Sequence, residues 1–412
     1  MPDVKENDLI EQGALPPDDF HDNIERIREV AQFNLEVPSD LKQRLMYECQ
    51  HLLVDEGTLF EAAAALEVGH LVLQGPPGTG KSSLARALCR AFQAVVLPVT
   101  AHEDWSTFEV IGRQELRVEE DDREQIVPVN GFFTESVIRC AGAIVRHFDD
   151  PNEPQAAWLL IDELNRAHLD KAFGELFTVL GTDELVPITL PHQREGNREL
   201  VTPRRFRIVA TLNSIDRQFV NSLSQGLKRR FTFITLEVPA PMESGEHWGS
   251  RDSGASLASR EFTVVIERAA DRVARRLVPA NADGVDAKRA ELTSLLQGAA
   301  FQTVVSLFEL VKKLRYAQEG SSVPYLAIGT AQLIDTVELF LSRVCSQDLP
   351  EEKYGATMDW AASVKLAPLF DADTISPADL ERYVTNALQP PFDMLMRREL
   401  RRILSSGMYY VG

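Results

Sequence analysis

The chain has 412 residues, of which 43 are Lys or Arg and 62 are Asp or Glu, so its formal charge is −19. This length suggests about two or three domains, and a hydrophobic content of 44% is ordinary for a folded protein. The acidic balance argues against a protein that coats nucleic acid or an anionic membrane through bulk charge.

The first part of the chain predicts an acidic lead-in followed by alternating helices and strands. Residues 1–40 are acidic and contain a Pro-Pro pair, which indicates a partly flexible segment. Apolar residues at helical spacing predict helices over 41–54 and 59–66. A short apolar strand at 70–75 ends in glycine, and a helix is predicted over 84–92.

The same alternation continues to about residue 239. Further strands are predicted at 95–100, 157–162, 206–214 and 230–238, helices at 131–148 and 171–180, and surface hairpins at 114–130 and 185–202. Strands that alternate with helices predict a parallel sheet with helices on both faces. We therefore assign an α/β domain to residues 41–239.

The second part of the chain changes character. PAPMESGEHWGSRDSGAS is rich in Pro, Gly and Ser, so we expect a linker at 240–256. Apolar residues then recur with a period of 3.6 at 304–316, 327–344 and 393–406. Residues 257–412 are expected to form a mostly helical domain.

The strongest chemical signal is GPPGTGKS, which fits the phosphate-loop pattern G-x-x-x-x-G-K-[ST] and lies between a predicted strand and a predicted helix. Glycines let backbone N–H groups wrap a phosphate, and the start of a helix favours an anion. Lys81 is expected to reach the β- and γ-phosphates, and the Ser82 hydroxyl to ligate Mg²⁺. The predicted nucleotide contacts are Gly75, Pro76, Pro77, Gly78, Thr79, Gly80, Lys81, Ser82, Ser83 and Asp162.

A pair of carboxylates ends the apolar strand LLIDE. The strand places Asp162 at the carboxyl edge of the sheet, beside the phosphate loop. Asp162 suits a magnesium site shared with Ser82, and Glu163 suits the polarisation of an attacking water. An apolar strand followed by Asp-Glu is common by itself, so this prediction depends on the phosphate loop that precedes it.

Two later segments add candidate residues. ATLNSIDR brings Asn213 to the same edge, where an amide is suited to hold the attacking water. A plain turn residue is the alternative. LKRRF places Arg229 and Arg230 just before the next strand, and an arginine from another subunit commonly neutralises the charge of phosphoryl transfer. A solvated basic turn is the alternative there.

In this order, GPPGTGKS, LLIDELNRA, ATLNSIDR and LKRRF resemble the motifs of AAA+ ATPases. More narrowly, the chain resembles the branch that holds McrB-type restriction motors, dynein-related proteins and MoxR-type ATPases. The NR after the acidic pair, the FGEL helix, the N-x-x-DR signature and the LKRRF end are most similar to McrB-type motor subunits. The resemblance covers residues 69–238, with a weaker match of the helical tail to an AAA+ lid.

The resemblance implies a P-loop AAA+ core, a helical lid and a ring, expected to be hexameric, with nucleotide at each subunit boundary. The residues implied to act within one subunit are Lys81, Ser82, Asp162, Glu163 and Asn213. Arg229 or Arg230 would reach the γ-phosphate bound to the neighbour, and Arg166 is a further candidate at that boundary. Asp216 and Arg217 match the family signature and would couple the site to a partner.

The implied cofactors are Mg²⁺ and ATP, with GTP as the alternative that McrB-type motors use. The implied partner is a separate effector or stimulating subunit. It would be an McrC-like nuclease in a prokaryotic defence complex, or a protein client if the chain is a MoxR-like remodelling chaperone. Direct nucleic-acid binding stays open. Only residues 1–74 precede the phosphate loop, so we expect a partner to recognise any nucleic acid.

One feature departs from the family pattern. Many AAA+ lids carry an arginine on a late helix that touches the γ-phosphate. The comparable turn here reads AIGTAQLID, with Thr330 and Gln332 where that arginine would stand. A lid contact through arginine is therefore not expected.

The remaining features favour a soluble cytoplasmic protein. The four cysteines lie far apart without metal-ligand spacing, which indicates reduced thiols. The N-terminus lacks an apolar signal region, and no apolar run of about 18 residues occurs, so no membrane contact is expected.

Trp105 and Phe108 suit either a pore loop or simple packing. The basic face formed by Arg397, Arg398, Arg401 and Arg402 suits a solvated or lid-packing surface, or a contact with an acidic partner or nucleic acid.

Overall fold

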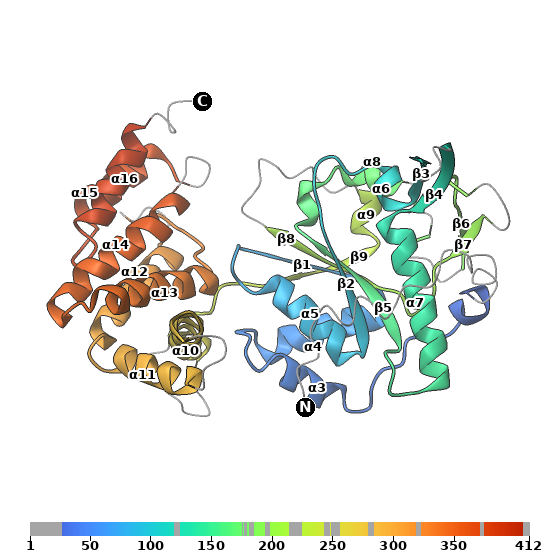
Figure 1. The fold of residues 1–412 in the computed structure, drawn as a ribbon. Helices are drawn as coiled ribbons and strands as arrows, with labels where there is room; N and C mark the ends of the chain where they lie inside the picture. Colours follow the sequence, from blue (N-terminus) through green and yellow to red (C-terminus); the bar gives the residue numbers. More distant parts are fainter. Residues whose placement is uncertain are drawn as a thin grey trace. The chain divides into compact units, whose positions relative to one another are not determined.

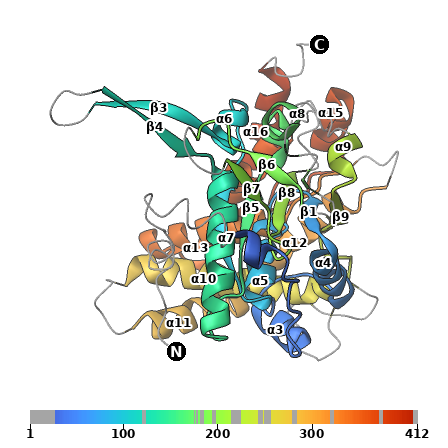
Figure 2. The same cartoon turned by 90° about the vertical axis from the view of Figure 1, so that its right-hand side faces the viewer.

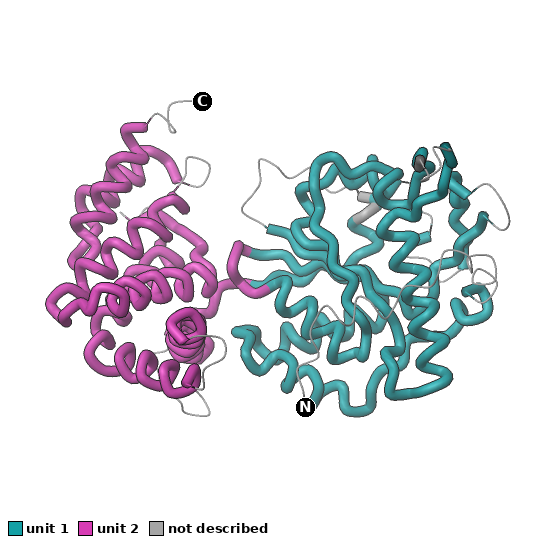
Figure 3. The backbone as a smooth tube through the Cα atoms, viewed as in Figure 1, with its two compact units in different colours: residues 1–75, 81–236 teal, residues 76–80, 237–412 magenta. Residues whose placement is uncertain are grey.

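The chain forms two compact units (Figure 3). The computed structural model describes residues 27–118, 124–174, 176, 179–180, 185–193, 198–213, 225–242, 248, 256–278, 284–318, 323–370 and 375–406. The first unit comprises Met1–Gly75 and Lys81–Leu236, and the second comprises Pro76–Gly80 and Glu237–Gly412. The second unit thus begins near the predicted linker but also takes in the tip of the phosphate loop.

A five-stranded parallel sheet, with strand order β2-β5-β8-β1-β9, forms the centre of the first unit. The strands are β1 (His70–Gly75), β2 (Ala94–Thr100), β5 (Ala156–Asp162), β8 (Ile208–Asn213) and β9 (Phe231–Thr235). All five predicted strands and their parallel pairing are confirmed. Six of the seven residues of β5 are buried, which explains the unbroken apolar run of this strand.

Helices cover both faces of this sheet, with α4 and α5 on one face and α7 on the other (Figures 1 and 2). The helices are α3 (Leu41–Glu48), α4 (Glu56–Val68), α5 (Lys81–Ala91), α6 (Thr107–Val110), α7 (Phe132–Asp149), the 3₁₀ turn η2 (Leu164–Arg166), α8 (Leu169–Phe173) and α9 (Gln225–Lys228). Leu84 and Leu88 of α5 are fully buried, as the helical spacing predicts. The helix predicted over 41–54 is shorter than expected, since α3 ends at Glu48. The helix predicted over 171–180 corresponds to α8, which ends at Phe173, and residues 175, 177 and 178 lie outside the described residues.

Both predicted hairpins are present. β3 (Gly112–Val118) pairs with β4 (Glu124–Asn130), and β6 (Pro187–Thr189) with β7 (Glu199–Val201), each pair antiparallel. Figure 2 shows β3 and β4 extending away from the central sheet. The two hairpins are joined through His192, whose Nε2 lies 2.9 Å from Asn130 Oδ1 and whose carbonyl oxygen accepts from Gln114 Nε2 at 3.1 Å.

Residues 27–40, expected as part of a partly flexible lead-in, are packed into the first unit. Ile27 and Val30 are buried in its core. The buried Arg205 donates from Nε to the carbonyl oxygen of Asn34 at 2.9 Å and also pairs with the carboxylate of Glu36. The sequence pattern missed this packing because it depends on a cation about 170 residues away in the chain.

Helices build the second unit: α10 (Leu257–Leu277), α11 (Val285–Gln297), α12 (Phe301–Arg315), α13 (Thr330–Gln347), α14 (Tyr354–Lys365), α15 (Pro377–Asn386) and α16 (Leu395–Ser405), with 3₁₀ turns η4 (Glu351–Lys353) and η5 (Ala367–Leu369). The predicted helical character of this region is confirmed. Its core holds a buried ion pair, in which Arg315 donates to both carboxylate oxygens of Glu261 at 2.7 and 2.8 Å. A buried charge needs such a partner.

Among the described residues, no single helix is long and apolar enough to cross a membrane, although α11 and α12 meet that test of length and composition as a pair bent by 70°. The four cysteines are free, and Cys49, Cys89 and Cys140 are buried.

Candidate functional site

The strand register brings the predicted site residues to one edge of the sheet. Gly75, the last residue of β1, lies opposite Asn213, the last residue of β8. Asp162 ends β5, which pairs with β8 on its other side. Because the strands are parallel, all three residues lie at the carboxyl edge, where ligands of open α/β sheets bind.

The phosphate loop runs from β1 into α5 with the backbone geometry that its glycines allow. Gly78 and Gly80 have φ angles of +78° and +87°, which side chains with a Cβ rarely adopt. Lys81 begins α5, is buried, and donates from Nζ to the carbonyl oxygen of Gly75 at 3.0 Å. This bond holds the ammonium group against the loop. Ser83, also predicted to contact nucleotide, is exposed on α5.

Ser82 and Asp162 meet beneath this loop. The Ser82 hydroxyl donates to Asp162 Oδ1 at 2.8 Å, and the Thr211 hydroxyl donates to the same oxygen. Mg²⁺ prefers oxygen ligands and is usually held by one or two carboxylates together with substrate phosphates. A hydroxyl and a carboxylate that already converge therefore fit the predicted magnesium site.

Glu163 has an unusual backbone conformation that three neighbours support. Its φ and ψ are 55° and 47°, in the left-handed region, a conformation that costs about 1–3 kcal/mol and persists only where surrounding contacts impose it. Its N–H donates to Thr211 Oγ1 at 3.0 Å, and its Oε1 accepts from Asn213 Nδ2 at 3.2 Å. Its Oε2 pairs with Arg166 Nε at 2.6 Å. The carboxylate is thus fixed beside Asn213.

Arg166, predicted as a candidate for the subunit boundary, pairs with Glu163 of its own chain. Its side chain is 57% exposed, so the pair lies at the surface of the unit. A surface ion pair is worth only about 0–1 kcal/mol. Arg166 can therefore leave Glu163 for another acidic or anionic partner at little cost in free energy.

Arg229 and Arg230 lie at the opposite edge of the sheet from the phosphate loop. They directly precede β9, whose first residue Phe231 pairs with His70 at the start of β1. The length of β1, roughly 20 Å for six residues, separates this edge from Gly75. The structure therefore does not bring Arg229 or Arg230 to the phosphate loop of the same chain.

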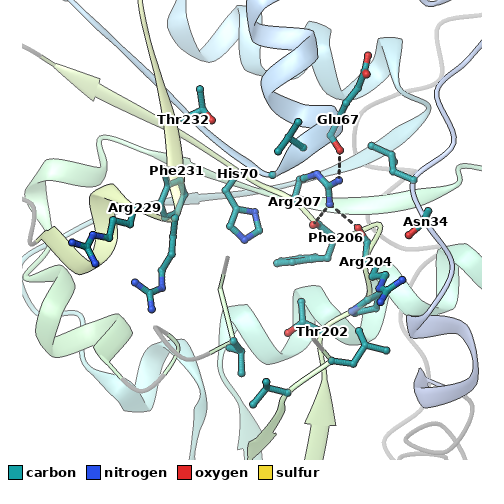
Figure 4. A pocket seen from close by; sticks show the side chains of 18 residues that line it. Asn34, Glu67, His70, Thr202, Arg204, Phe206, Arg207, Arg229, Phe231 and Thr232 are labelled. Carbon is teal, nitrogen blue, oxygen red and sulfur yellow. Dashed lines mark hydrogen bonds between the residues drawn. The ribbon is translucent and has the colours of Figure 1, made fainter. Parts of the chain in front are cut away.

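The two arginines differ in their contacts. Arg230 donates from Nη1 to the carbonyl oxygen of Gly226 at 2.6 Å. Arg229 is exposed, and the described part of the chain gives it no hydrogen-bond or ion-pair partner. Figure 4 shows the Arg229 side chain directed away from the sheet.

Within the second unit, the tip of the phosphate loop contacts the start of α13. The N–H of Ala331 donates to the carbonyl oxygen of Gly78 at 3.1 Å, and Gln332 Nε2 donates to that of Pro77 at 3.4 Å. The turn AIGTAQLID, which lacks an arginine, thus contacts the backbone of the phosphate loop through the N–H of Ala331 and the side-chain amide of Gln332.

Two residues of the candidate site were not singled out by the sequence patterns. Thr211 binds Asp162 and Glu163, as described above, and the buried Asn165 accepts from the N–H of Asn213 at 3.5 Å. Thr211 lies two residues before Asn213 in β8, so the strand period of two could have revealed it. Asp216 and Arg217 lie outside the described residues.

Trp105, considered for a pore loop, is buried and packs on Phe132 with ring centroids 4.5 Å apart, which supports the packing alternative. Phe108 is exposed. In the basic face of α16, Arg397 donates from Nη2 to the carbonyl oxygen of Leu388 at 2.7 Å, which is a packing contact. Arg401 and Arg402 are exposed.

Comparison with known proteins agrees with this geometry. Residues 70–231 match the family model of the AAA domain, dynein-related subfamily. The chain is 27% identical over 180 residues to the Type IV methyl-directed restriction enzyme EcoKMcrB subunit of Escherichia coli (strain K12), which covers 41% of this chain and 35% of that protein. It is 26% identical over 224 residues to Protein NorQ of Paracoccus denitrificans (strain Pd 1222), which covers 53% of this chain and 69% of that protein. The chain therefore matches about a third of the length of the McrB subunit.

Proposed function

We propose that the chain is a ring-forming nucleoside triphosphatase that acts as a motor subunit, because residues 70–231 match the AAA domain of the dynein-related subfamily. In this proposal, residues 41–239 are the AAA+ core and residues 257–412 the helical lid. The observation that carries the proposal is the convergence of Lys81, Asp162 and Glu163 at one sheet edge.

Each residue has a distinct part in the proposed hydrolysis. The loop N–H groups and Lys81 bind the phosphates, and Asn213 orients the attacking water. Glu163 takes the proton from that water, because a carboxylate fixed by Asn213 is positioned for proton transfer. When bound by Ser82 and Asp162, Mg²⁺ would neutralise charge on the phosphates.

The proposed site is completed by a neighbouring subunit. The distance between the two sheet edges prevents Arg229 from reaching the nucleotide of its own chain, whereas an adjacent subunit in a ring brings the two edges together. Arg229 is the better candidate for action in trans, because Arg230 is bonded to Gly226. Release of Glu163 from Arg166 would accompany assembly, since Arg166 would then face the neighbour.

We propose ATP as the nucleotide, with GTP as the alternative, and a hexamer as the ring. By its similarity to the McrB subunit, which is named as part of a restriction enzyme, the chain would drive a prokaryotic defence complex with a separate effector such as an McrC-like nuclease. A partner would then read any nucleic acid.

The similarity to Protein NorQ supports a second candidate function. In this alternative the chain is a MoxR-like remodelling ATPase that acts on a protein client, with the same chemistry at the same residues. Purification of the chain with its partners from its native host separates the two functions, because the first predicts a nuclease-like partner and the second a von Willebrand-type or client protein.

Phosphate release by the purified protein, measured with ATP and GTP side by side and together with particle mass, tests the proposed function. We expect magnesium-dependent turnover that rises as the protein assembles into a ring. A protein that remains monomeric with either nucleotide, yet hydrolyses it at an undiminished rate on dilution, would contradict the proposed ring.

Substitution of Thr211 by valine is expected to reduce turnover about 10–100-fold, as the loss of a residue that supports metal ligands typically does. Valine keeps the shape of threonine but removes the hydroxyl that binds both Asp162 and the N–H of Glu163. The Mg²⁺ concentration that gives half-maximal turnover should rise, because Asp162 loses a hydrogen bond that orients it. Thr211→Ser keeps the hydroxyl and is the matched control. Equal turnover in Thr211→Val and the unmodified protein would show that this hydroxyl has no part in the site.

A further inference from the structure

A cavity of about 560 Å³ lies at the amino ends of β1, β8 and β9 in the first unit (Figure 4). His70, the first residue of β1, lies at this cavity, whereas Gly75, the last residue of the same strand, lies at the phosphate loop. Ligands of open α/β sheets ordinarily bind at the carboxyl ends of the strands. The cavity is therefore not explained by the usual ligand site of this fold.

Two neutral donors face the cavity without partners. His70 Nδ1 accepts from the N–H of Ile208 at 3.1 Å, so the proton of the neutral ring lies on Nε2, which has no partner among the described residues. Burial, reinforced by the charge of Arg207, lowers the pKa of His70 to about 3, and the ring stays neutral near pH 7. Thr202 Oγ1 is buried and also lacks a hydrogen-bond partner in the described part of the chain.

Four arginines line the same cavity: Arg204, Arg207, Arg229 and Arg230. Arg207 is occupied, because its Nε and Nη2 donate to the carbonyl oxygens of Leu66 and Glu67 at 2.6 and 3.0 Å. Burial lowers the pKa of Arg207 to about 10, so it remains a cation at neutral pH. Arg204 and Arg229 are exposed, and Arg204 and Arg230 each have a further interaction.

The described part of the lining has few groups that would oppose an anion. Glu67 is the one acidic residue among the described residues that line the cavity. Figure 4 shows its carboxylate pointing away from the cavity, while the ring of His70 points into it. Leu35, Val186 and Phe206 supply an apolar wall. The volume falls within the range of small-molecule sites, about 300–1,000 Å³.

We propose that this cavity binds a small organic phosphate, separate from the nucleotide site of the same chain, and that the bound phosphate holds Arg229 back from the neighbouring subunit. Guanidinium groups match phosphate geometry with paired hydrogen bonds, His70 and Thr202 supply further donors, and the apolar wall takes the body of the molecule. The restraint of Arg229 by the bound phosphate rests on the proposed function, whereas the binding of phosphate in the cavity does not.

Titration calorimetry with 1-naphthyl phosphate tests the binding, because this probe joins a phosphate to a flat apolar body. The Lys81→Ala chain should bind the probe within twofold of the unmodified chain, since the phosphate loop is not involved. Neutral 1-naphthol should bind at least about tenfold more weakly, because it lacks the charge-assisted bonds. Loss of probe binding in Lys81→Ala would assign the probe to the phosphate loop and overturn the proposal.

Two conservative variants locate the probe in the cavity. Thr202→Val removes one hydroxyl at constant shape and is expected to weaken binding about three- to tenfold. Arg204→Gln is expected to weaken it about tenfold or more. Arg90→Gln, an exposed arginine of α5 outside the lining, is the matched control and should have no effect. Unchanged affinity in both cavity variants would overturn the proposal.

Phosphate release tests the effect on Arg229. The probe should slow hydrolysis at saturating nucleotide, and Thr202→Val should require about three- to tenfold more probe for the same inhibition. Probe binding without inhibition would leave the cavity a ligand site and overturn its control of Arg229. The probe should also bind the assembled ring more weakly than the dispersed chain, because the probe and the neighbouring subunit compete for Arg229. Equal affinity of the probe for both forms would overturn the control of Arg229.

Discussion

Substitution of Lys81 by alanine is expected to abolish nucleotide binding, with affinity at least roughly 100-fold lower. Lys81 is buried against the loop, where its ammonium group is bonded to Gly75. A charge-assisted bond to phosphate is worth about 1.5–3 kcal/mol, and because Lys81 is buried we expect the loss to fall at or beyond the upper end of that range. Equilibrium binding of a fluorescent ATP or GTP analogue measures the effect.

Lys42→Ala, at an exposed lysine of α3, is the matched control, and should bind nucleotide as the unmodified chain does. Thermal unfolding of Lys81→Ala without nucleotide separates a lost contact from a lost fold. A folded Lys81→Ala chain that binds nucleotide within twofold of the unmodified chain would show that the phosphate loop is not the nucleotide site.

Substitution of Arg229 by alanine is expected to leave nucleotide binding intact and to lower turnover about 1,000-fold or more, which is the usual contribution of an arginine that neutralises transferring phosphate. The physical reason is the placement of Arg229 at the sheet edge opposite the phosphate loop, with no partner among the described residues. In the proposed ring, this edge of the sheet faces the nucleotide of a neighbouring subunit.

Mixing experiments distinguish action in trans from action in cis. Small amounts of Arg229→Ala should inhibit unmodified rings by more than their share of subunits, because each variant subunit disables the site of its neighbour. Arg230→Ala is the matched variant and should inhibit less, since Arg230 is bonded to Gly226 of its own chain. A linear fall of activity with the fraction of Arg229→Ala would exclude action in trans.

Most of the fold could be predicted from sequence because local pattern and tertiary structure agree there. The apolar run of β5 needs burial on both faces, and the glycines of the phosphate loop need a backbone that other residues rarely adopt. The packing of residues 27–40 could not be predicted, because it depends on Arg205, a buried cation remote in sequence.

The same distinction holds within the candidate site. The sequence order of Lys81, Asp162 and Asn213 was enough to predict that they lie together, since parallel strands bring their carboxyl ends to one edge. The left-handed backbone of Glu163 and its pairing with Arg166 were not predictable, because they depend on side chains of one strand, β8, and of the turn η2. The difference between Arg229 and Arg230 likewise depends on a carbonyl contact that spacing does not encode.

Phosphate release by Glu163→Gln, measured beside nucleotide binding by the same preparation, tests the proposed hydrolysis most directly. Glutamine keeps the size of the side chain and an oxygen that can accept from Asn213, but it cannot take a proton from water. We predict unchanged binding and turnover lower by about 100–10,000-fold, the usual contribution of a positioned base. Turnover equal to that of the unmodified chain would contradict the assignment of Glu163 as the base.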